Sequence, residues 1–322
     1  MRLARTLLAS LVALFISATF AQTQLSIATG GTGGTYYPVG GGYAELINDY
    51  LDGYQAVAEV TGASVENVGL ISRGDSDIAL ALADTVYQAY TGTGQLEGRQ
   101  LENLRSLGVA YANTVHIVTL ADSGIESISD LEGKVVSVGA PGSGTEVSAQ
   151  TLLNANGITY DQIDERRLNF NETAAALRDG QIEAGFWSVG PPTSSILDLA
   201  TTRDIKILSL SDEEIQNALE AEPTFARTVI PAETYPGQEE DVVTVGTPNV
   251  IVVSAEMDDQ LAYDFLDVLY SHIDEIIAIH PSGNQTTPQN SIESTPIPLH
   301  PGAVAYYEDQ GLEVPDDVRP PQ

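Results

Sequence analysis

The stretch LSIATGGTGGTYYPVGGGYAELIN, residues 25–48, predicts a short strand, a glycine-rich loop and a helix that begins near Pro38. Apolar and polar residues alternate before the glycines, whereas Tyr43, Leu46 and Ile47 recur after them at the spacing of one helical face. Glycine permits backbone conformations closed to other residues and lets a ligand approach the main chain, and the first turn of a helix presents unpaired N–H groups. An anion could bind here without any basic side chain.

This glycine loop matches neither of the common phosphate-binding motifs. The dinucleotide fingerprint requires a third glycine where Tyr36 stands, and a P-loop requires Lys followed by Ser or Thr, which neither this loop nor residues 139–144 supply. A plain tight connection between strand and helix stays open as the alternative, but the number of glycines favours a ligand site. The residues of this loop that we expect to contact a ligand are Gly33, Gly34, Thr35, Tyr36 and Tyr37.

The run ATGGTGGTYYPVGGGYAELIN, residues 28–48, resembles the signature of the TAXI family, the solute receptors of tripartite ATP-independent periplasmic (TRAP) transporters. Three later stretches agree with that family: residues 139–145 (GAPGSGT), 186–193 (FWSVGPPT) and 298–307 (PLHPGAVAYY). The resemblance implies a receptor for a small organic anion, such as glutamate or a dicarboxylate. It also implies delivery of that anion to TRAP permease subunits in the membrane, driven by an ion gradient.

The N-terminal segment predicts export of the protein. Residues 1–21 carry Arg2 and Arg5, an apolar run from residue 7 to residue 20, and a small residue, Ala21, at the end. This pattern is typical of a cleavable signal peptide and indicates a periplasmic protein. A retained membrane anchor is the alternative, but the apolar run is shorter than the roughly 20 residues that cross a bilayer.

Composition and charge narrow the classes of partner. The sequence of 322 residues contains no cysteine, so disulfides, thiolate nucleophiles and cysteine metal sites are excluded. Its formal net charge of −32 would repel nucleic acid and anionic membrane surfaces, so we expect neither as a partner. The length exceeds the size at which one hydrophobic core usually keeps growing, which favours two domains. We expect the mature protein to be a monomer.

A unit of strand, glycine loop, helix, second helix and strand is predicted twice, over residues 25–83 and 134–187. Each unit would present loops and helix N-termini at the carboxyl ends of its parallel strands. We therefore expect an α/β protein with the two-domain, Venus-flytrap (type II-like) fold of periplasmic binding proteins and a ligand cleft between the domains. From the second unit Ser143, Gly144 and Thr145 should face the first glycine loop across that cleft.

The predicted boundaries follow from two β-rich runs that cross between the domains. Residues 113–120 form the first crossing and residues 242–253 the return. Domain I is predicted to comprise residues 22–118 plus 248–322, and domain II residues 119–247.

Other elements are predicted from local signals. Ser211 and Glu214 form the capping box of a short helix. A long amphipathic helix is expected over residues 257–279. We expect the proline-rich residues 282–322 to lie over the surface as a strap in which only residues 302–307 are helical, and a ligand or partner role for this tail stays open.

The sequence contains no recognisable catalytic constellation. The four histidines do not show the i, i+4 spacing of a helical zinc pair, and Ser143 does not lie in a nucleophile elbow. We therefore expect no enzyme activity, no metal and no cofactor. A receptor of an ATP-driven (ABC) importer is the alternative receptor class, and an exported glycosidase that uses paired carboxylates is the alternative enzyme class.

Two further side chains are candidates for the ligand site. Trp187, with Tyr36 or Tyr37, is predicted to provide apolar cover for the ligand, and packing of Trp187 in a core is the alternative. Arg73 is the basic residue nearest to the predicted cleft. A solvated position at the end of its helix is the alternative for Arg73.

Overall fold

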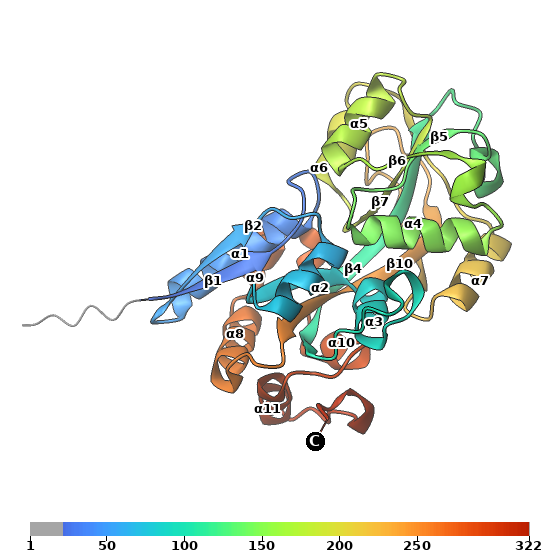
Figure 1. Cartoon of the computed structure of the whole chain (residues 1–322). Helices are drawn as coiled ribbons and strands as arrows, with labels where there is room; N and C mark the ends of the chain where they lie inside the picture. The colour runs from blue at the N-terminus through green and yellow to red at the C-terminus, as the bar shows by residue number, and fades with distance from the viewer. Residues whose placement is uncertain (1–21, 322) are drawn as a thin grey trace, which may run out of the picture.

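The computed structural model describes residues 22–321, so the predicted signal peptide, residues 1–21, lies outside the described residues. The chain forms two lobes of helices packed around one continuous mixed sheet, and the sheet runs from one lobe into the other (Figure 1). None of the helices in this part of the chain is long and apolar enough to cross a membrane.

Ten strands of the described residues form the sheet, in the order β2-β1-β3-β10-β4-β7-β5-β6, with β8 beside β4 and β9 beside β10. The strands are β1 (Thr23–Ala28), β2 (Tyr54–Glu59), β3 (Ile78–Leu82), β4 (Leu104–Leu120), β5 (Val135–Ser137), β6 (Asp164–Arg166), β7 (Ala184–Val189), β8 (Ile205–Ile207), β9 (Ala226–Ile230) and β10 (Val242–Ser254).

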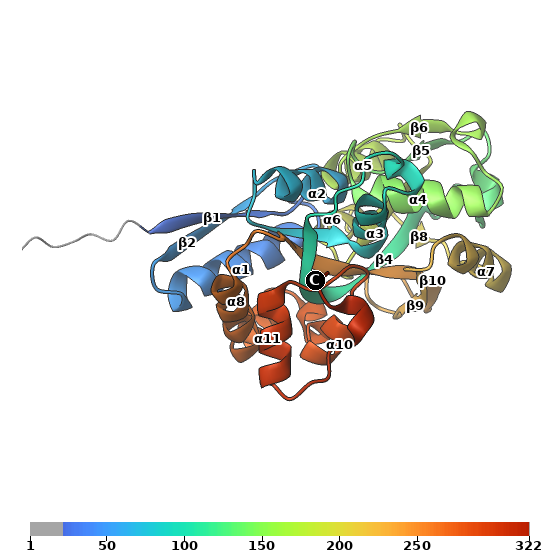
Figure 2. The ribbon, with the colours of Figure 1, turned by 60° about the horizontal axis from the view of Figure 1, so that its bottom comes forward.

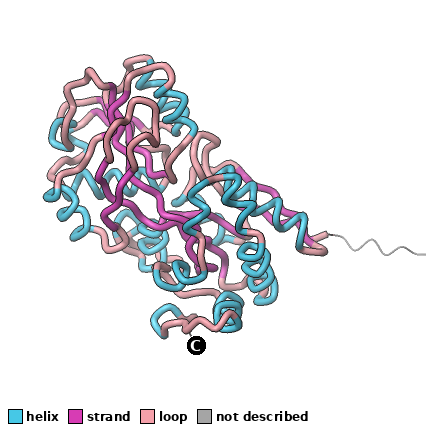
Figure 3. The backbone as a smooth tube through the Cα atoms, turned by 180° about the vertical axis from the view of Figure 1, so that it is seen from behind, coloured by secondary structure: helices cyan, strands magenta, loops and turns pink. Residues whose placement is uncertain are grey.

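The sheet contains the repeated unit that the sequence predicts. Strand β1 pairs in parallel with β2 and β3, and β5 pairs in parallel with β6 and β7 in the same way. The long strands β10 and β4 lie between the two units and pair antiparallel with each other and with their neighbours β3 and β7. Figure 3 shows these strands passing from one lobe into the other.

Helices cover both faces of the sheet. The α-helices are α1 (Tyr36–Tyr50), α2 (Ser64–Arg73), α3 (Ala83–Thr91), α4 (Gly144–Ala155), α5 (Phe170–Arg178), α6 (Ser194–Ala200), α7 (Asp212–Ala221), α8 (Asp259–Ser271), α9 (Ile273–Ile279), α10 (Pro288–Glu293) and α11 (Pro301–Asp309). Short 3-10 turns lie at η1 (Gly94–Leu96), η2 (Ile128–Leu131), η3 (Tyr160–Gln162), η4 (Pro281–Gln285) and η5 (Asp316–Val318). The predicted capping box of Ser211 and Glu214 is confirmed at the start of α7.

Separate apolar cores define the two lobes. The cores of the first lobe take Tyr111 from β4 and Val250 from β10, whereas those of the second lobe take Val115 from β4 and Val245 from β10. Each long strand therefore contributes one half to each lobe. We propose that the lobes meet between these residues, close to the predicted domain boundaries at 118/119 and 247/248.

The expected single helix over residues 257–279 is wrong, because the structure breaks it at His272. The backbone of His272 has φ −120° and ψ 25°, outside the helical region, and its ring stacks on Tyr50 of α1 with ring centroids 3.7 Å apart. Helix α8 ends before this residue and α9 begins after it.

The C-terminal tail has more helix than expected and belongs to the core of the first lobe. Besides α11 it contains α10 and two 3-10 turns, and these helices pack beneath the sheet (Figure 2). Tyr307 is fully buried and donates a hydrogen bond to the carbonyl of Leu107 on β4 at 2.7 Å. Apolar residues between the prolines, such as Leu299 and Ile292, are buried in the same core. The tail is therefore part of the hydrophobic core and does not lie on the surface as a strap.

Candidate functional site

A cavity of about 360 Å³ lies between the two lobes. Its walls come from segments that directly follow, or end, the parallel strands β1, β2 and β3 of the first unit and β5, β6 and β7 of the second. The carboxyl ends of parallel strands are where open α/β sheets bind ligands. The size is also within the range of small-molecule pockets, which makes this cavity the candidate ligand site.

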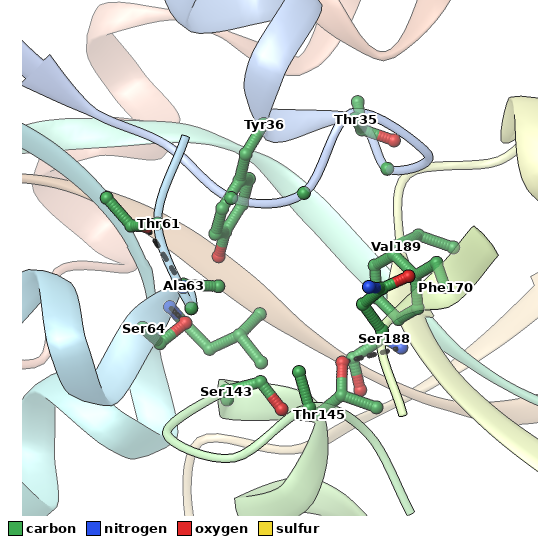
Figure 4. Close-up of a pocket in the computed structure, with 18 of the residues that line it drawn as sticks. Thr35, Tyr36, Thr61, Ala63, Ser64, Ser143, Thr145, Phe170, Ser188 and Val189 are labelled. Carbon is green, nitrogen blue, oxygen red and sulfur yellow. Dashed lines mark hydrogen bonds between the residues drawn. The ribbon is translucent and has the colours of Figure 1, made fainter. Parts of the chain in front are cut away.

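The structure brings together six of the nine residues that the sequence singled out. Gly34, Thr35 and Tyr36 line the cavity from the first lobe, and Ser143, Gly144 and Thr145 line it from the second. Figure 4 shows Thr35 and Tyr36 on one side of the cavity, with Ser143 and Thr145 on the other. The two glycine loops therefore form opposing walls.

Gly33 lies behind the cavity wall and joins the two lobes. It is absent from the lining, and its carbonyl accepts hydrogen bonds from the Thr193 hydroxyl at 3.1 Å and the Ser195 N–H at 3.4 Å. A Cβ atom at Gly33 would overlap the amide of Asn171 on α5. The glycine here permits close approach of the second lobe instead of close approach of a ligand.

Trp187 and Tyr37 do not line the cavity either. Trp187 is fully buried, and its indole N–H donates to the Ser195 hydroxyl at 3.1 Å. Phe170 stacks on the indole with ring centroids 6.1 Å apart and presents its own ring to the cavity. The aromatic cover expected from Trp187 is thus supplied by Phe170, while Tyr37 is 38% exposed on the surface of α1.

Four helix N-termini converge on the cavity. The lining includes the N-cap and first residue of α1, α2, α4 and α5, which are Thr35 and Tyr36, Ala63 and Ser64, Ser143 and Gly144, and Asn169 and Phe170. A helix N-terminus carries partial positive charge and N–H groups without helical partners. Ala63 has a φ of 77°, a backbone conformation that residues other than glycine rarely adopt and that is often found at ligand sites.

The lining carries no charge of its own. Among the described residues that line the cavity, none is Asp, Glu, Lys, Arg or His. Arg73, the basic candidate from the sequence, pairs with Asp75 at 2.8 Å and is 60% exposed, so it lies away from the cavity. Any anion in the cavity would therefore be bound by backbone N–H groups, hydroxyls and helix dipoles.

A buried hydrogen-bond network links the cavity walls through the two crossing strands. The Tyr36 hydroxyl donates to Asn249 Oδ1 on β10, and burial raises the pKa of Tyr36 so that the hydroxyl keeps its proton. Asn249 Nδ2 donates to Asn113 Oδ1 on β4 at 2.8 Å, and Asn113 Nδ2 donates to the carbonyl of Ser188 at 2.7 Å. This network connects a ligand-lining residue of each lobe.

The residues that sequence reasoning missed include Asn113, Phe170 and Ser188, which line the cavity, and Asn249, which bonds to Asn113 behind it. The sequence does contain a pattern that could have identified Asn113 and Asn249. Each is an amide within a predominantly apolar strand, in NTVHIVTL and in TPNVIVVS. A buried amide must find hydrogen-bond partners, so its place in such a run indicates a structured polar network.

The lobes also contact each other on the far side of the cavity. The carbonyl of Gly142 accepts from the N–H groups of Val65 and Glu66 in the first turn of α2, at 3.1 and 3.2 Å. Ser148 of α4 donates to Asp84 of α3 at 2.7 Å. Together with the Gly33 contacts, these bonds enclose the cavity on two sides.

The model of the NMT1-like family matches residues 27–311, which is most of the chain. The chain belongs to the NMT1-like family. Solved structures similar to this NMT1-like chain share its fold at low sequence identity. One is the ligand-binding component of an ABC-type import system from Staphylococcus aureus, solved with zinc bound, with 11% identity and a TM-score of 0.51 over 93% of this chain and 97% of that chain.

Two further structures extend the comparison of the NMT1-like chain. A protein from Bordetella bronchiseptica RB50 has 16% identity and a TM-score of 0.52 over 92% of this chain and 91% of that chain. The periplasmic aliphatic sulphonate binding protein SsuA from Escherichia coli has 14% identity and a TM-score of 0.49 over 89% and 83%. With the two lobes and the shared sheet, the likenesses to the Staphylococcus aureus and Bordetella bronchiseptica structures confirm the predicted α/β fold of two domains.

Proposed function

We propose that this NMT1-like protein is the extracytoplasmic solute receptor of a TRAP transporter of the TAXI type. It binds a small organic carboxylate and delivers it to the permease subunits in the membrane. The observation that carries the proposal is the cavity between the lobes, where four helix N-termini meet and the described lining has no charged side chain. Two stretches that resemble TAXI landmarks, residues 28–48 and 139–145, supply opposing walls of this cavity.

The proposed ligand class follows from the charge of the walls. A helix N-terminus stabilises a negative group by roughly 0.3 to 2 kcal/mol, towards the upper value where the group is partly buried. The resemblance implies glutamate-like amino acids or dicarboxylates as ligands. A carboxylate is the group that these implied ligands share and that the cavity can bind.

A thermal-shift screen tests the proposed ligand class. A ligand that binds only the folded protein stabilises it by about 2.7 kcal/mol at a hundredfold excess over its Kd, which raises the Tm by several degrees. Carboxylates should stabilise the purified protein, and neutral sugars and nucleotides should not. Polyamines will bind the acidic surface, but added salt should remove their effect. Salt-resistant stabilisation by a sugar, with no response to any carboxylate, would contradict the proposal.

The receptor of an ABC importer is the second candidate, because the Staphylococcus aureus import component has the same fold. The two classes differ in the energy source for uptake. Uptake by the receptor with its own permease should stop when the ion gradient is collapsed while ATP is maintained. Uptake that survives this treatment and stops when ATP is depleted would identify an ABC importer instead.

The glycosidase alternative finds no support in the cavity. That reaction requires two carboxyl groups on either side of the scissile bond. The described residues that line the cavity include neither Asp nor Glu.

A further inference from the structure

The four helix N-termini at the cavity differ in their charge. Three of the helices carry a glutamate in the first turn: Glu66 in α2, Glu146 in α4 and Glu172 in α5. A negative charge at this position offsets the partial positive charge of the helix end. Helix α1 has no acidic residue in its first turn, and no side chain caps it. Of the four helices, only α1 lacks a first-turn carboxylate, so nothing in its own first turn offsets the partial positive charge of its N-terminus.

The other three helix ends are also occupied by protein groups. Carbonyl and side-chain oxygens accept hydrogen bonds from their first-turn N–H groups: the carbonyl of Gly142 at α2, the hydroxyl of Ser143 at α4 and Asn169 Oδ1 at α5. At α1 the hydroxyl of the N-cap residue Thr35 turns away and donates to the carbonyl of Gly190 at 2.9 Å. Of the four helix ends, α1 is thus the one where no side-chain or loop oxygen caps the first-turn N–H groups, so it is the most available to an anionic group.

A second observation points to a ligand in the same cavity. Ser188 lines the cavity from β7, is 5% exposed, and its hydroxyl has no hydrogen-bond partner among the described residues. A buried polar group left without a partner costs free energy, and for a group that lines a cavity a ligand can supply the partner. The Ser188 hydroxyl can donate to an oxygen of a ligand held between the lobes.

The rest of the wall suits an uncharged ligand body. Phe170, Leu82, Val60 and Val189 contribute apolar surface, and the polar residues around them are hydroxyls and amides. An ammonium group would find no carboxylate in the described lining, and a second carboxylate would find no cation. Burying an unpaired charge costs far more than a lost hydrogen bond.

On the basis of the proposed receptor function, we infer that the cavity selects organic monocarboxylates whose remaining body is uncharged. The carboxylate binds at the N-terminus of α1, and the body lies against Phe170 and the apolar residues around it. Amino acids are disfavoured by their ammonium group and dicarboxylates by their second charge. This inference keeps the carboxylate class of the proposed function but departs from the resemblance, which implies glutamate-like or dicarboxylate ligands.

A matched ligand series tests the selectivity. Isothermal titration of the purified protein compares unbranched monocarboxylates of four to eight carbons with the 2-amino acids and the dicarboxylates of the same length. The best monocarboxylate should bind at least about tenfold more tightly than either charged analogue, because each analogue buries one unpaired charge. The amide of the best monocarboxylate, which lacks the negative charge, should bind more weakly as well.

Two variants test the placement of the ligand. Ser188→Ala should weaken the best monocarboxylate roughly 10- to 100-fold, as expected for a hydrogen bond to a charged group. The control is Thr247→Val, because the Thr247 hydroxyl is also buried without a partner in the described chain but does not line the cavity. Asn169→Asp keeps the cap of α5 but adds a negative charge to the wall, and it should weaken monocarboxylates and narrow their advantage over amino acids.

The outcomes separate this inference from the proposed function. Equal or tighter binding of amino acids or dicarboxylates overturns the inference and leaves the carboxylate receptor in place. Binding of no carboxylate in the series, with binding of a sugar, overturns both. An unchanged affinity in Ser188→Ala, equal to that of Thr247→Val, overturns the placement of the ligand against Ser188.

Discussion

Asp84 Oδ2 accepts a hydrogen bond from the Ser148 hydroxyl at 2.7 Å, and the two residues belong to different lobes. Asp84 is fully buried at the start of α3, and burial raises its pKa to about 6. This pKa of about 6 is a net value: burial is the largest contribution and the nearby Glu222, itself 4% exposed, also raises it, whereas the hydrogen bonds of Ser148 and Thr85 lower it. The interface between the lobes therefore contains a carboxyl group that titrates near neutral pH.

The first prediction concerns the pH dependence of stability. Between pH 3.8 and about 6 the folded protein keeps a proton on Asp84 that the unfolded chain has lost. The stabilising contribution is thus full below the lower value and is lost as the pH rises to the upper one. A difference of about two pKa units corresponds to about 3 kcal/mol. Asp84→Asn should remove this dependence, because an amide does not titrate.

Urea unfolding of the wild type and Asp84→Asn at several pH values checks this. The free energy of unfolding of the wild type minus that of the variant should fall by about 3 kcal/mol from pH 3.5 to pH 7. Asp122→Asn controls for the loss of one negative charge, since Asp122 lies exposed on the second lobe. A difference that does not change with pH would show that Asp84 is not linked to stability in this way.

The second prediction concerns closure of the lobes at Gly33. We predict that ligand binding closes the lobes about β4 and β10. Gly33→Ala would place a methyl group against the Asn171 amide, which is the exposed end of a side chain and must turn aside, so it should cost at most about 1 kcal/mol in the closed form and weaken ligand binding accordingly. Small-angle scattering should show less compaction at saturating ligand than in the wild type.

A second substitution decides whether this clash is the cause. Asn171→Ala removes the atoms that the new methyl group would meet, so the double variant should recover affinity and compaction. Gly41→Ala is the matched control, because nothing lies within 4 Å of a Cβ atom at that position in α1. If Asn171→Ala fails to rescue Gly33→Ala, the assignment of Gly33 to lobe contact is wrong.

The third prediction compares two buried tyrosines of α1. Tyr36→Phe removes the donor to Asn249 and leaves that buried amide oxygen without its partner, so it should lower the free energy of unfolding by about 1–3 kcal/mol. Tyr43→Phe should change it by less than about 0.5 kcal/mol, because the Tyr43 hydroxyl has no partner among the described residues. Chemical unfolding of both variants measures the difference. Equal losses would remove the proposed role of the Tyr36–Asn249 bond.

The fourth prediction uses the only tryptophan as a probe. Trp187 is fully buried and hydrogen-bonded to Ser195, so its emission should be at short wavelength and resist quenching by acrylamide. Saturating ligand should leave the emission maximum in place, because Phe170 separates the indole from the cavity. A large shift of the emission maximum on ligand binding would instead indicate direct contact between Trp187 and the ligand.

The sequence predicted those features that depend on neighbours along the chain. The strand, glycine loop and helix of residues 25–48 have local signals in hydrophobic period and glycine content, and the Ser211–Glu214 box needs only one turn of helix to form. The same local signals occur in two parts of the chain, and they predicted two repeated units and hence two lobes. Because each glycine loop follows a parallel strand and precedes a helix, the opposing walls of the cavity could also be predicted.

Only the tertiary structure decided which individual side chains reach the cavity. Trp187 and Ser188 are neighbours on β7 and point to opposite faces of the sheet, and the packing of Phe170 decides that Trp187 faces the core. Gly33 and Gly34 are likewise adjacent, but only Gly34 lines the cavity, because Gly33 contacts Thr193 of the second lobe instead. The contact between Gly33 and Thr193 joins residues 160 positions apart, and Phe170 packs on Trp187 from a different secondary-structure element, so no local pattern predicts either choice.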